Sequence, residues 1–175
     1  MLLFAISGSL RTNSANTAVL QAASLIAPPV VEITLYDGLG QLPHFNPDLD
    51  GDGVAPAVTD FRRRVQQADG VIFSVPEYAH GVPGTLKNAL DWLVGSGEFV
   101  DKPVALFNAS SRGAYAQAQL TETLTVMTAR VLPGVTLPLT GNRITAEQIA
   151  ADPAMSAMLR EALERFAATA RPSAA

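Results

Sequence analysis

The sequence contains no cysteine, only two histidines, and few charged residues, which make up 16% of its 175 positions. Without cysteine the chain has no disulfide, no thiolate nucleophile and no sulfur ligand for a metal. The two histidines, His44 and His80, are too few for a histidine-rich metal site. These absences exclude a disulfide scaffold, a cysteine enzyme and a cysteine-ligated metal centre, and we expect no bound metal.

The chain also lacks a run of basic residues and a long run of apolar ones. Twelve lysines and arginines are scattered among 16 acidic residues, which gives a net charge of −4. This pattern argues against a nucleic-acid partner. The apolar start at 1–6 has no basic leader and turns polar at Ser7, and no stretch approaches the length of a membrane span. We therefore expect a cytoplasmic protein with no membrane partner.

Apolar residues are nevertheless plentiful, at 48% of the chain with a mean hydropathy of +0.21. This is enough material for the core of one ordinary domain. No internal repeat, linker or low-complexity tract divides the chain. We expect residues 1–175 to form a single domain.

Short apolar runs of strand-like composition alternate along the chain with stretches patterned as helices. The predicted strands lie at 2–6, 30–35, 70–75, 103–108 and 131–139, and the predicted helices at 14–26, 55–68, 84–94, 114–129 and 153–169. Such alternation is typical of an α/β protein with a doubly wound parallel sheet covered by helices on both faces. Ligands of these folds bind beyond the carboxyl ends of the strands, so the segments after Ile6, Val75 and Phe107 are the first candidates for a site.

The segment after the first strand reads Ser7-Gly-Ser-Leu-Arg-Thr-Asn-Ser-Ala-Asn16. It combines the free N–H groups of a helix start with four hydroxyls and the guanidinium of Arg11, which suits an anion, most of all a phosphate. The glycine spacing of a dinucleotide site and the Gly-Lys-Ser/Thr ending of a P-loop are both absent. A monophosphate bound without metal fits these residues. The alternative is that the hydroxyls only turn the chain and cap the helix.

Two further polar loops follow the third and fourth predicted strands. Pro76–Gly84 contains two prolines and two glycines, which predict a rigid loop, and it carries Glu77, Tyr78 and His80. These side chains suit the face and edge of a planar heteroaromatic ligand, although Tyr78 could instead pack on the loop itself. Asn108–Tyr115 precedes a helix and supplies more free N–H donors. Together the three loops predict a site for a flat ring system that carries a phosphate.

The chain resembles the NAD(P)H-dependent FMN reductase family in four segments. In sequence order these are Ser7-Gly-Ser-Leu-Arg11, Pro76-Glu-Tyr78, Gly81-Val-Pro-Gly84 and Leu86–Trp92. The resemblance runs through most of the chain and implies a flavodoxin-like three-layer sandwich, with a five-stranded parallel sheet in the order 2-1-3-4-5. Many members carry a glycine-rich third loop. Here that loop keeps one glycine and adds Arg112.

The resemblance implies which residues bind the cofactor. It places the FMN phosphate on Ser9, Arg11, Ser14 and Asn16, and the isoalloxazine ring on Pro76, Glu77, Tyr78 and Gly81. His80 is expected at the border of the ring site. Peptide N–H groups near Glu77 and Tyr78, and others around Ser110, Ser111 and Arg112, are candidates to stabilise the reduced ring.

No acid–base or nucleophile constellation is evident, and hydride transfer through a flavin needs none. We therefore predict an oxidoreductase without a catalytic side chain, which passes a hydride from NADPH or NADH through FMN to a quinone or similar small acceptor by a ping-pong mechanism. The alternatives are a flavodoxin-type electron carrier without its own substrate, and a protein that keeps the fold but has lost the flavin site. A phosphoacceptor receiver is excluded because serines stand where its acidic residues would be.

Several features outside these loops bear on metal binding and assembly. Asp48–Gly53 imitates the start of a calcium loop, but Thr59 stands at the position of the essential glutamate, so we assign no metal. By resemblance we expect a homodimer or homotetramer built through the helix that carries Trp92. Trp92 would suit the interface as a buried anchor, although such a tryptophan more often belongs to the core. The long segment 37–56 is expected to pack on a partner subunit beside the flavin.

Overall fold

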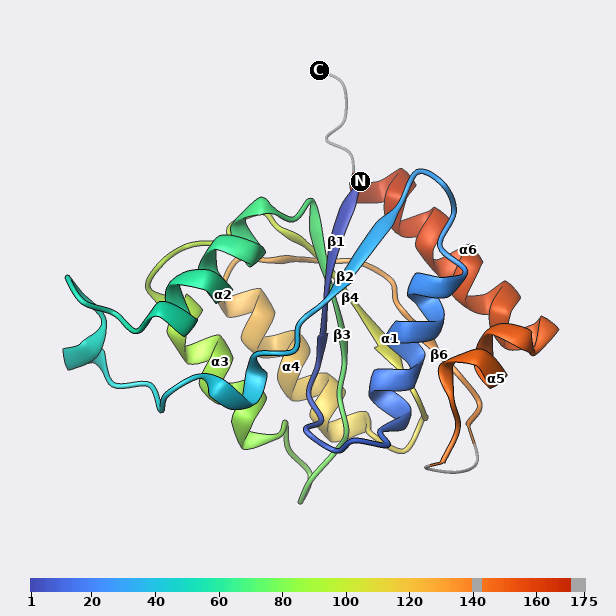
Figure 1. The fold of residues 1–175 in the computed structure, drawn as a ribbon, viewed down its shortest axis with the longest axis horizontal. Helices are drawn as coiled ribbons and strands as arrows, with labels where there is room; N and C mark the ends of the chain where they lie inside the picture. Colours follow the sequence, from blue (N-terminus) through green and yellow to red (C-terminus); the bar gives the residue numbers. More distant parts are fainter. Residues whose placement is uncertain (140–142, 171–175) are drawn as a thin grey trace.

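The computed structural model describes residues 1–139 and 143–170 and contains a parallel sheet between two layers of helices (Figure 1). The strand order is β2-β1-β3-β4-β5. β5 pairs with the first residues of β4, and β6 pairs with its last residues. This order confirms the predicted flavodoxin-like topology. The strands are β1 (Leu2–Ser7), β2 (Glu32–Leu35), β3 (Gly70–Ser74), β4 (Pro103–Asn108), β5 (Arg130–Val131) and β6 (Val135–Thr136).

The helices divide between the two faces of the sheet. One face is covered by α1 (Ala15–Leu25), α5 (Ala146–Ala151) and α6 (Pro153–Ala170), and the other by α2 (Pro56–Gln67), α3 (Gly84–Val94) and α4 (Ala114–Val126) (Figure 1). Two short 3-10 turns, η1 (Leu39–Gln41) and η2 (Pro47–Leu49), lie in the long connection after β2. No helix among the described residues is both long and apolar enough to cross a membrane.

The central strands are apolar along their whole length because both of their faces are covered. In β1, Leu3 and Ala5 face α1 and α6, whereas Phe4 and Ile6 face α2 and α3, and all four are at most 1% exposed. The parallel register places Phe4 beside Val71 of β3. Continuous burial of this kind is what the unbroken apolar runs predicted.

The prediction of one strand at 131–139 is wrong. The chain forms β5 and β6 instead, separated by Leu132–Gly134. Pro133 has no N–H to donate to a neighbouring strand, and Gly134 passes so close to β4 that a Cβ there would lie 1.9 Å from the carbonyl oxygen of Leu106. The break in the strand therefore comes from a proline and a close backbone approach.

Helix α5 was not predicted, although its start carries a recognisable signal. The hydroxyl of Thr145 accepts from the backbone N–H of Gln148, and the side chain of Gln148 accepts from the N–H of Thr145. This capping box satisfies two N–H groups at the start of the helix. The Thr-x-x-Gln pattern is visible in the sequence.

The long connection after β2 packs on α3 of the same chain. Asn88 donates to the carbonyl of Pro43 and accepts from the N–H of Phe45, at 2.9 and 2.8 Å, and the indole N–H of Trp92 donates to the same carbonyl at 2.8 Å. The ring of Phe45 meets that of Trp92 edge-on, with ring centroids 5.0 Å apart. Trp92 is only 1% exposed and belongs to the core of this chain.

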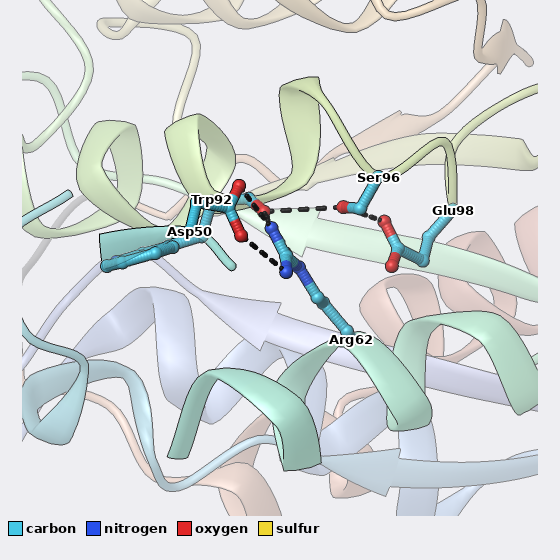
Figure 2. Close-up of polar contacts among 5 residues, drawn as sticks. All are labelled: Asp50, Arg62, Trp92, Ser96 and Glu98. Atoms are coloured by element: carbon cyan, nitrogen blue, oxygen red, sulfur yellow. Dashed lines mark hydrogen bonds and ion pairs between the residues drawn. The ribbon is translucent and has the colours of Figure 1, made fainter. Parts of the chain in front are cut away.

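Arg62 of α2 holds the far end of this connection (Figure 2). Its guanidinium donates to both carboxylate oxygens of Asp50, at 2.8 and 2.9 Å, and to the main-chain carbonyl of Trp92 near the end of α3. These hydrogen bonds lower the pKa of Asp50 below its ordinary value of 3.8. Asp50, one carboxylate of the calcium-like motif, is thus engaged by an arginine, and the described residues contain no group of three or more potential metal ligands.

We expect Gly134→Ala to lower the free energy of unfolding by about 2–3 kcal/mol, because the new methyl group would meet main-chain atoms of β4 that cannot move aside. Urea denaturation measures the change. Gly95→Ala is the control, since a Cβ there meets nothing within 4 Å, and its effect should stay within about 0.5 kcal/mol. Equal effects of the two substitutions would contradict the close approach at Gly134.

We expect Arg62→Ala to cost about 1–3 kcal/mol of unfolding free energy, since it removes a bidentate ion pair and the donor to Trp92. The matched control is Arg63→Ala, which removes an exposed ion pair on the same helix and should cost less than about 1 kcal/mol. Because the folded-state pKa of Asp50 is lowered, the stabilisation is present at neutral pH and is lost as the pH falls through that pKa. The difference in unfolding free energy between wild type and Arg62→Ala should therefore become smaller in acid, which urea denaturation at several pH values measures.

Candidate functional site

A cavity of about 380 Å³ lies at the carboxyl ends of β1, β3 and β4. The fold brings the three suspected loops to this edge because the strands run parallel. Nine of the predicted site residues line the cavity: Ser9, Arg11, Ser14, Asn16, Pro76, Glu77, Tyr78, Ser110 and Arg112. Its other lining residues are Ala15, Val75, Ala109, Gly113 and Leu139.

The start of α1 opens into this cavity. Ser14 is the N-cap residue and accepts from the N–H of Thr17 through a long contact of 3.4 Å. The N–H groups of Ala15 and Asn16 have no acceptor among the described residues. The capping interpretation is therefore confirmed. Anion binding stays a prediction, which is compatible with the cap because two donors and the positive end of the helix dipole still face the cavity.

The loop between β1 and α1 is shaped by short internal hydrogen bonds. The hydroxyls of Ser7 and Thr17 lie 2.8 Å apart, and the hydroxyl of Ser9 accepts from the N–H of Arg11. Asn16 is fixed from another strand, because its Oδ1 accepts from the hydroxyl of the fully buried Ser74 at 3.1 Å. The amide of Asn16 is thereby oriented at the edge of the cavity.

The loop after β3 is a tight turn formed without glycine at its tip. Tyr78 and Gly81 exchange two main-chain hydrogen bonds, and the residues between them, Ala79 and His80, have φ values of 49° and 59°. These angles are left-handed, a region that glycine or asparagine adopts more readily than alanine or histidine. The sequence predicted a rigid loop from its prolines and glycines. The structure places two residues with strained backbone angles, Ala79 and His80, at the tip of the turn.

Three predicted site residues lie outside the lining of the cavity. The ring of His80 stacks on Tyr115 of α4, with centroids 4.2 Å apart and planes 24° apart. Gly81 closes the tight turn, and Ser111 is exposed. His80 thus lies beside α4, while Tyr78, 53% exposed, lines the cavity itself.

Glu77 connects the loop after β3 to α4. Its Oε2 accepts from the N–H groups of Tyr115 and Ala116, at 2.8 and 3.0 Å. The start of α4 is therefore satisfied by a carboxylate, whereas the start of α1 keeps free donors. This contrast places the stronger anion-binding end of the cavity at α1.

The charges in the cavity are unequal. Arg11 and Arg112 line it together with a single acid, Glu77. Among the described residues, no carboxylate lies within ion-pair distance of either arginine. Two guanidinium groups without acidic partners favour an anionic ligand.

Sequence reasoning missed Ser74 and Leu139. Ser74 had a visible signal, since it is the single polar residue that ends an otherwise apolar buried strand. Leu139 reaches the cavity from the segment after β6, and no local pattern distinguishes it from other core residues.

The N–H donors of the site and its apolar walls together suit a planar ligand with an attached anion.

The fold and cavity define a doubly wound α/β protein with an open site beyond the carboxyl ends of its strands. Residues 1–142 match the family model described as NADPH-dependent FMN reductase, and the chain belongs to this family.

Similar proteins agree with this membership. The chain is 43% identical over 124 residues to an NAD(P)H-dependent FMN reductase of Pseudomonas aeruginosa, a match that covers 68% of this chain and 66% of that protein. It is 35% identical over 117 residues to a quinone reductase of Escherichia coli K12, with 64% and 61% covered. Both matches span just under two thirds of the relative's own length.

A solved structure resembles nearly the whole chain. The flavoenzyme FerB, an NAD(P)H:(acceptor) oxidoreductase of Paracoccus denitrificans, superposes with a TM-score of 0.77 at 28% identity. The superposition covers 97% of this chain and 96% of FerB. The fold is therefore shared over nearly the whole length of the two chains.

Proposed function

We propose that the protein is an FMN-dependent NAD(P)H oxidoreductase that passes electrons to a quinone or a similar small acceptor. The observation that carries the proposal is the pair of free N–H groups at the start of α1. They share one cavity with Arg11 and with the exposed side chain of Tyr78. Family membership and the likeness to reductases of FMN and quinones support the same activity.

The residues present fit FMN. The cavity volume of about 380 Å³ lies within the usual range of small-molecule sites. Hydroxyls, free N–H groups and a guanidinium at one end suit a phosphate, and an aromatic ring with main-chain donors at the other suits a planar heterocycle. We propose that Ser9, Arg11, Ser14 and Asn16 hold the phosphate, and that Pro76, Glu77, Tyr78, Ser110 and Arg112 surround the ring.

The proposed chemistry needs little from the side chains beyond placement. FMN, when bound, supplies a ring that accepts a hydride from the nicotinamide and returns electrons to an acceptor. The chain orients that ring. The N–H groups of Ser110, Ser111 and Gly113, which have no acceptor among the described residues, would stabilise negative charge, whereas that of Arg112 donates to the hydroxyl of Ser110. We propose that NAD(P)⁺ leaves before the acceptor binds in the same opening, which gives ping-pong kinetics.

We also propose that residues 1–175 act as one FMN-binding domain in a homodimer or homotetramer. Leu10, Tyr78 and Tyr115 are each more than half exposed, on or beside the loops that form the cavity. An apolar rim of this kind is suited to burial against a second copy. Sedimentation of the FMN-loaded protein measures the assembly directly.

The proposed function is tested by adding FMN to the purified protein without oxygen and then one equivalent of NADPH or NADH. We expect a bound-flavin absorbance spectrum that bleaches, and colour that returns when a quinone is added. Bound flavin that neither nucleotide bleaches would identify an electron carrier. Absence of binding with excess FMN would overturn the proposal.

The phosphate assignment predicts a difference between FMN and riboflavin. We expect Arg11→Ala to weaken FMN binding about 10- to 100-fold, because a charge-assisted hydrogen bond to the phosphate is lost, and to leave riboflavin binding nearly unchanged. Quenching of flavin fluorescence gives both dissociation constants. The control is Arg160→Ala on α6, away from the cavity lining. Equal weakening of both ligands would place Arg11 away from the phosphate.

A further inference from the structure

Glu77 makes a contact that joins two walls of the cavity. It stands in the loop after β3, 38 positions before Tyr115, and its Oε2 accepts from the first turn of α4. Both Glu77 and the residues just before α4, Arg112 and Gly113, line the cavity. One carboxylate therefore connects the loop expected to face the ring with the loop expected to face its far side.

Two more contacts run between the same two segments. Gln119 of α4 accepts from the N–H of Val82 at 2.7 Å, and the ring of His80 stacks on that of Tyr115. The turn at Ala79 and His80 is held in left-handed geometry while it makes this stack. Strain of this kind persists only where the surroundings fix the chain, and here the fixing partner is α4.

The sequence of α4 provides no cap of its own. Its N-cap residue is Gly113, which has no side chain, and its first turn contains no acidic residue. Without Glu77 the N–H groups of Tyr115 and Ala116 would have no acceptor within the helix. One oxygen of the carboxylate accepts from both N–H groups, and the carboxylate carries the negative charge that the helix dipole favours.

We propose that Glu77 is a positioning residue, which sets the distance between the loop at 76–82 and the loop at 109–113 by capping α4 across the cavity. The inference rests on the proposed function for its consequence, because this spacing defines the slot for the planar ring. It assigns to Glu77 a task other than the ring contact that the family resemblance implies. A single hydrogen-bonded carboxylate then keeps the slot open to the same width whether or not the cofactor is present.

The test compares Glu77→Ala and Glu77→Gln with two controls. Glu122→Ala removes an exposed carboxylate from the same helix, and Arg62→Ala lowers stability far from the cavity lining. The first readout is amide hydrogen exchange of Tyr115 and Ala116 in the cofactor-free protein. The second is the dissociation constant for FMN. Exchange needs no flavin, so it remains informative if the proposed function is wrong.

For Glu77→Ala we expect exchange at both amides to become about 5- to 30-fold faster, and FMN binding to weaken about 10-fold. Glu77→Gln keeps an acceptor oxygen and should restore FMN binding to within about 3-fold of wild type. Both controls should bind FMN as wild type does. A wild type that binds no FMN would overturn the proposed function alone.

Two results would overturn the positioning role. One is unchanged exchange at Tyr115 and Ala116 in Glu77→Ala. The other is weaker FMN binding in Glu77→Gln equal to that in Glu77→Ala, which would mean that the negative charge of Glu77 acts on the ligand and the cap is incidental.

Discussion

The whole site depends on the parallel pairing of β1, β3 and β4. Parallel strands end at one edge of the sheet, and each must be followed by a loop that leads back over a face. Three such loops therefore meet at one edge of the sheet, and contacts between the loops are not needed to bring them together. The buried alternation of Leu3, Phe4, Ala5 and Ile6 fixes the register, and with it the height of each loop.

Among the helices that begin at this edge, α1 and α4 have their first residues or N-cap in the cavity lining, and these two starts differ. The start of α1 keeps free N–H groups at Ala15 and Asn16, and the start of α4 is closed by Glu77. A cavity with two open helix ends would attract anions at either side. With Glu77 on the start of α4, the helix start in this cavity that keeps its positive dipole end without a carboxylate is that of α1.

Much of this arrangement could be predicted from the sequence because its signals are local. Apolar runs predicted β1, β3 and β4, and their parallel order predicted that the serine-rich loop with Arg11 lies at the cavity. Anion binding by that loop stays a prediction. The rest depends on contacts between distant residues: the split of β5 from β6 comes from the approach of Gly134 to Leu106, and the role of Glu77 from α4. No pattern around residue 77 shows that its partner lies 38 positions away. Two local signals went unused: the capping box at Thr145 and the polar end of β3 at Ser74.

The connection between β2 and α2 shows how unevenly a long loop can be bound to its domain. The main-chain carbonyl of Pro43 is held by two donors of α3, and the side chain of Asp50 is held by the guanidinium of Arg62. Between Asp50 and α2, the glycines at 51 and 53 are exposed, and a Cβ on either would meet nothing within 4 Å. Chain breaks, inserted peptides and new termini are therefore best accommodated at this tip, a few residues from a stretch where they would pull Trp92 out of the core.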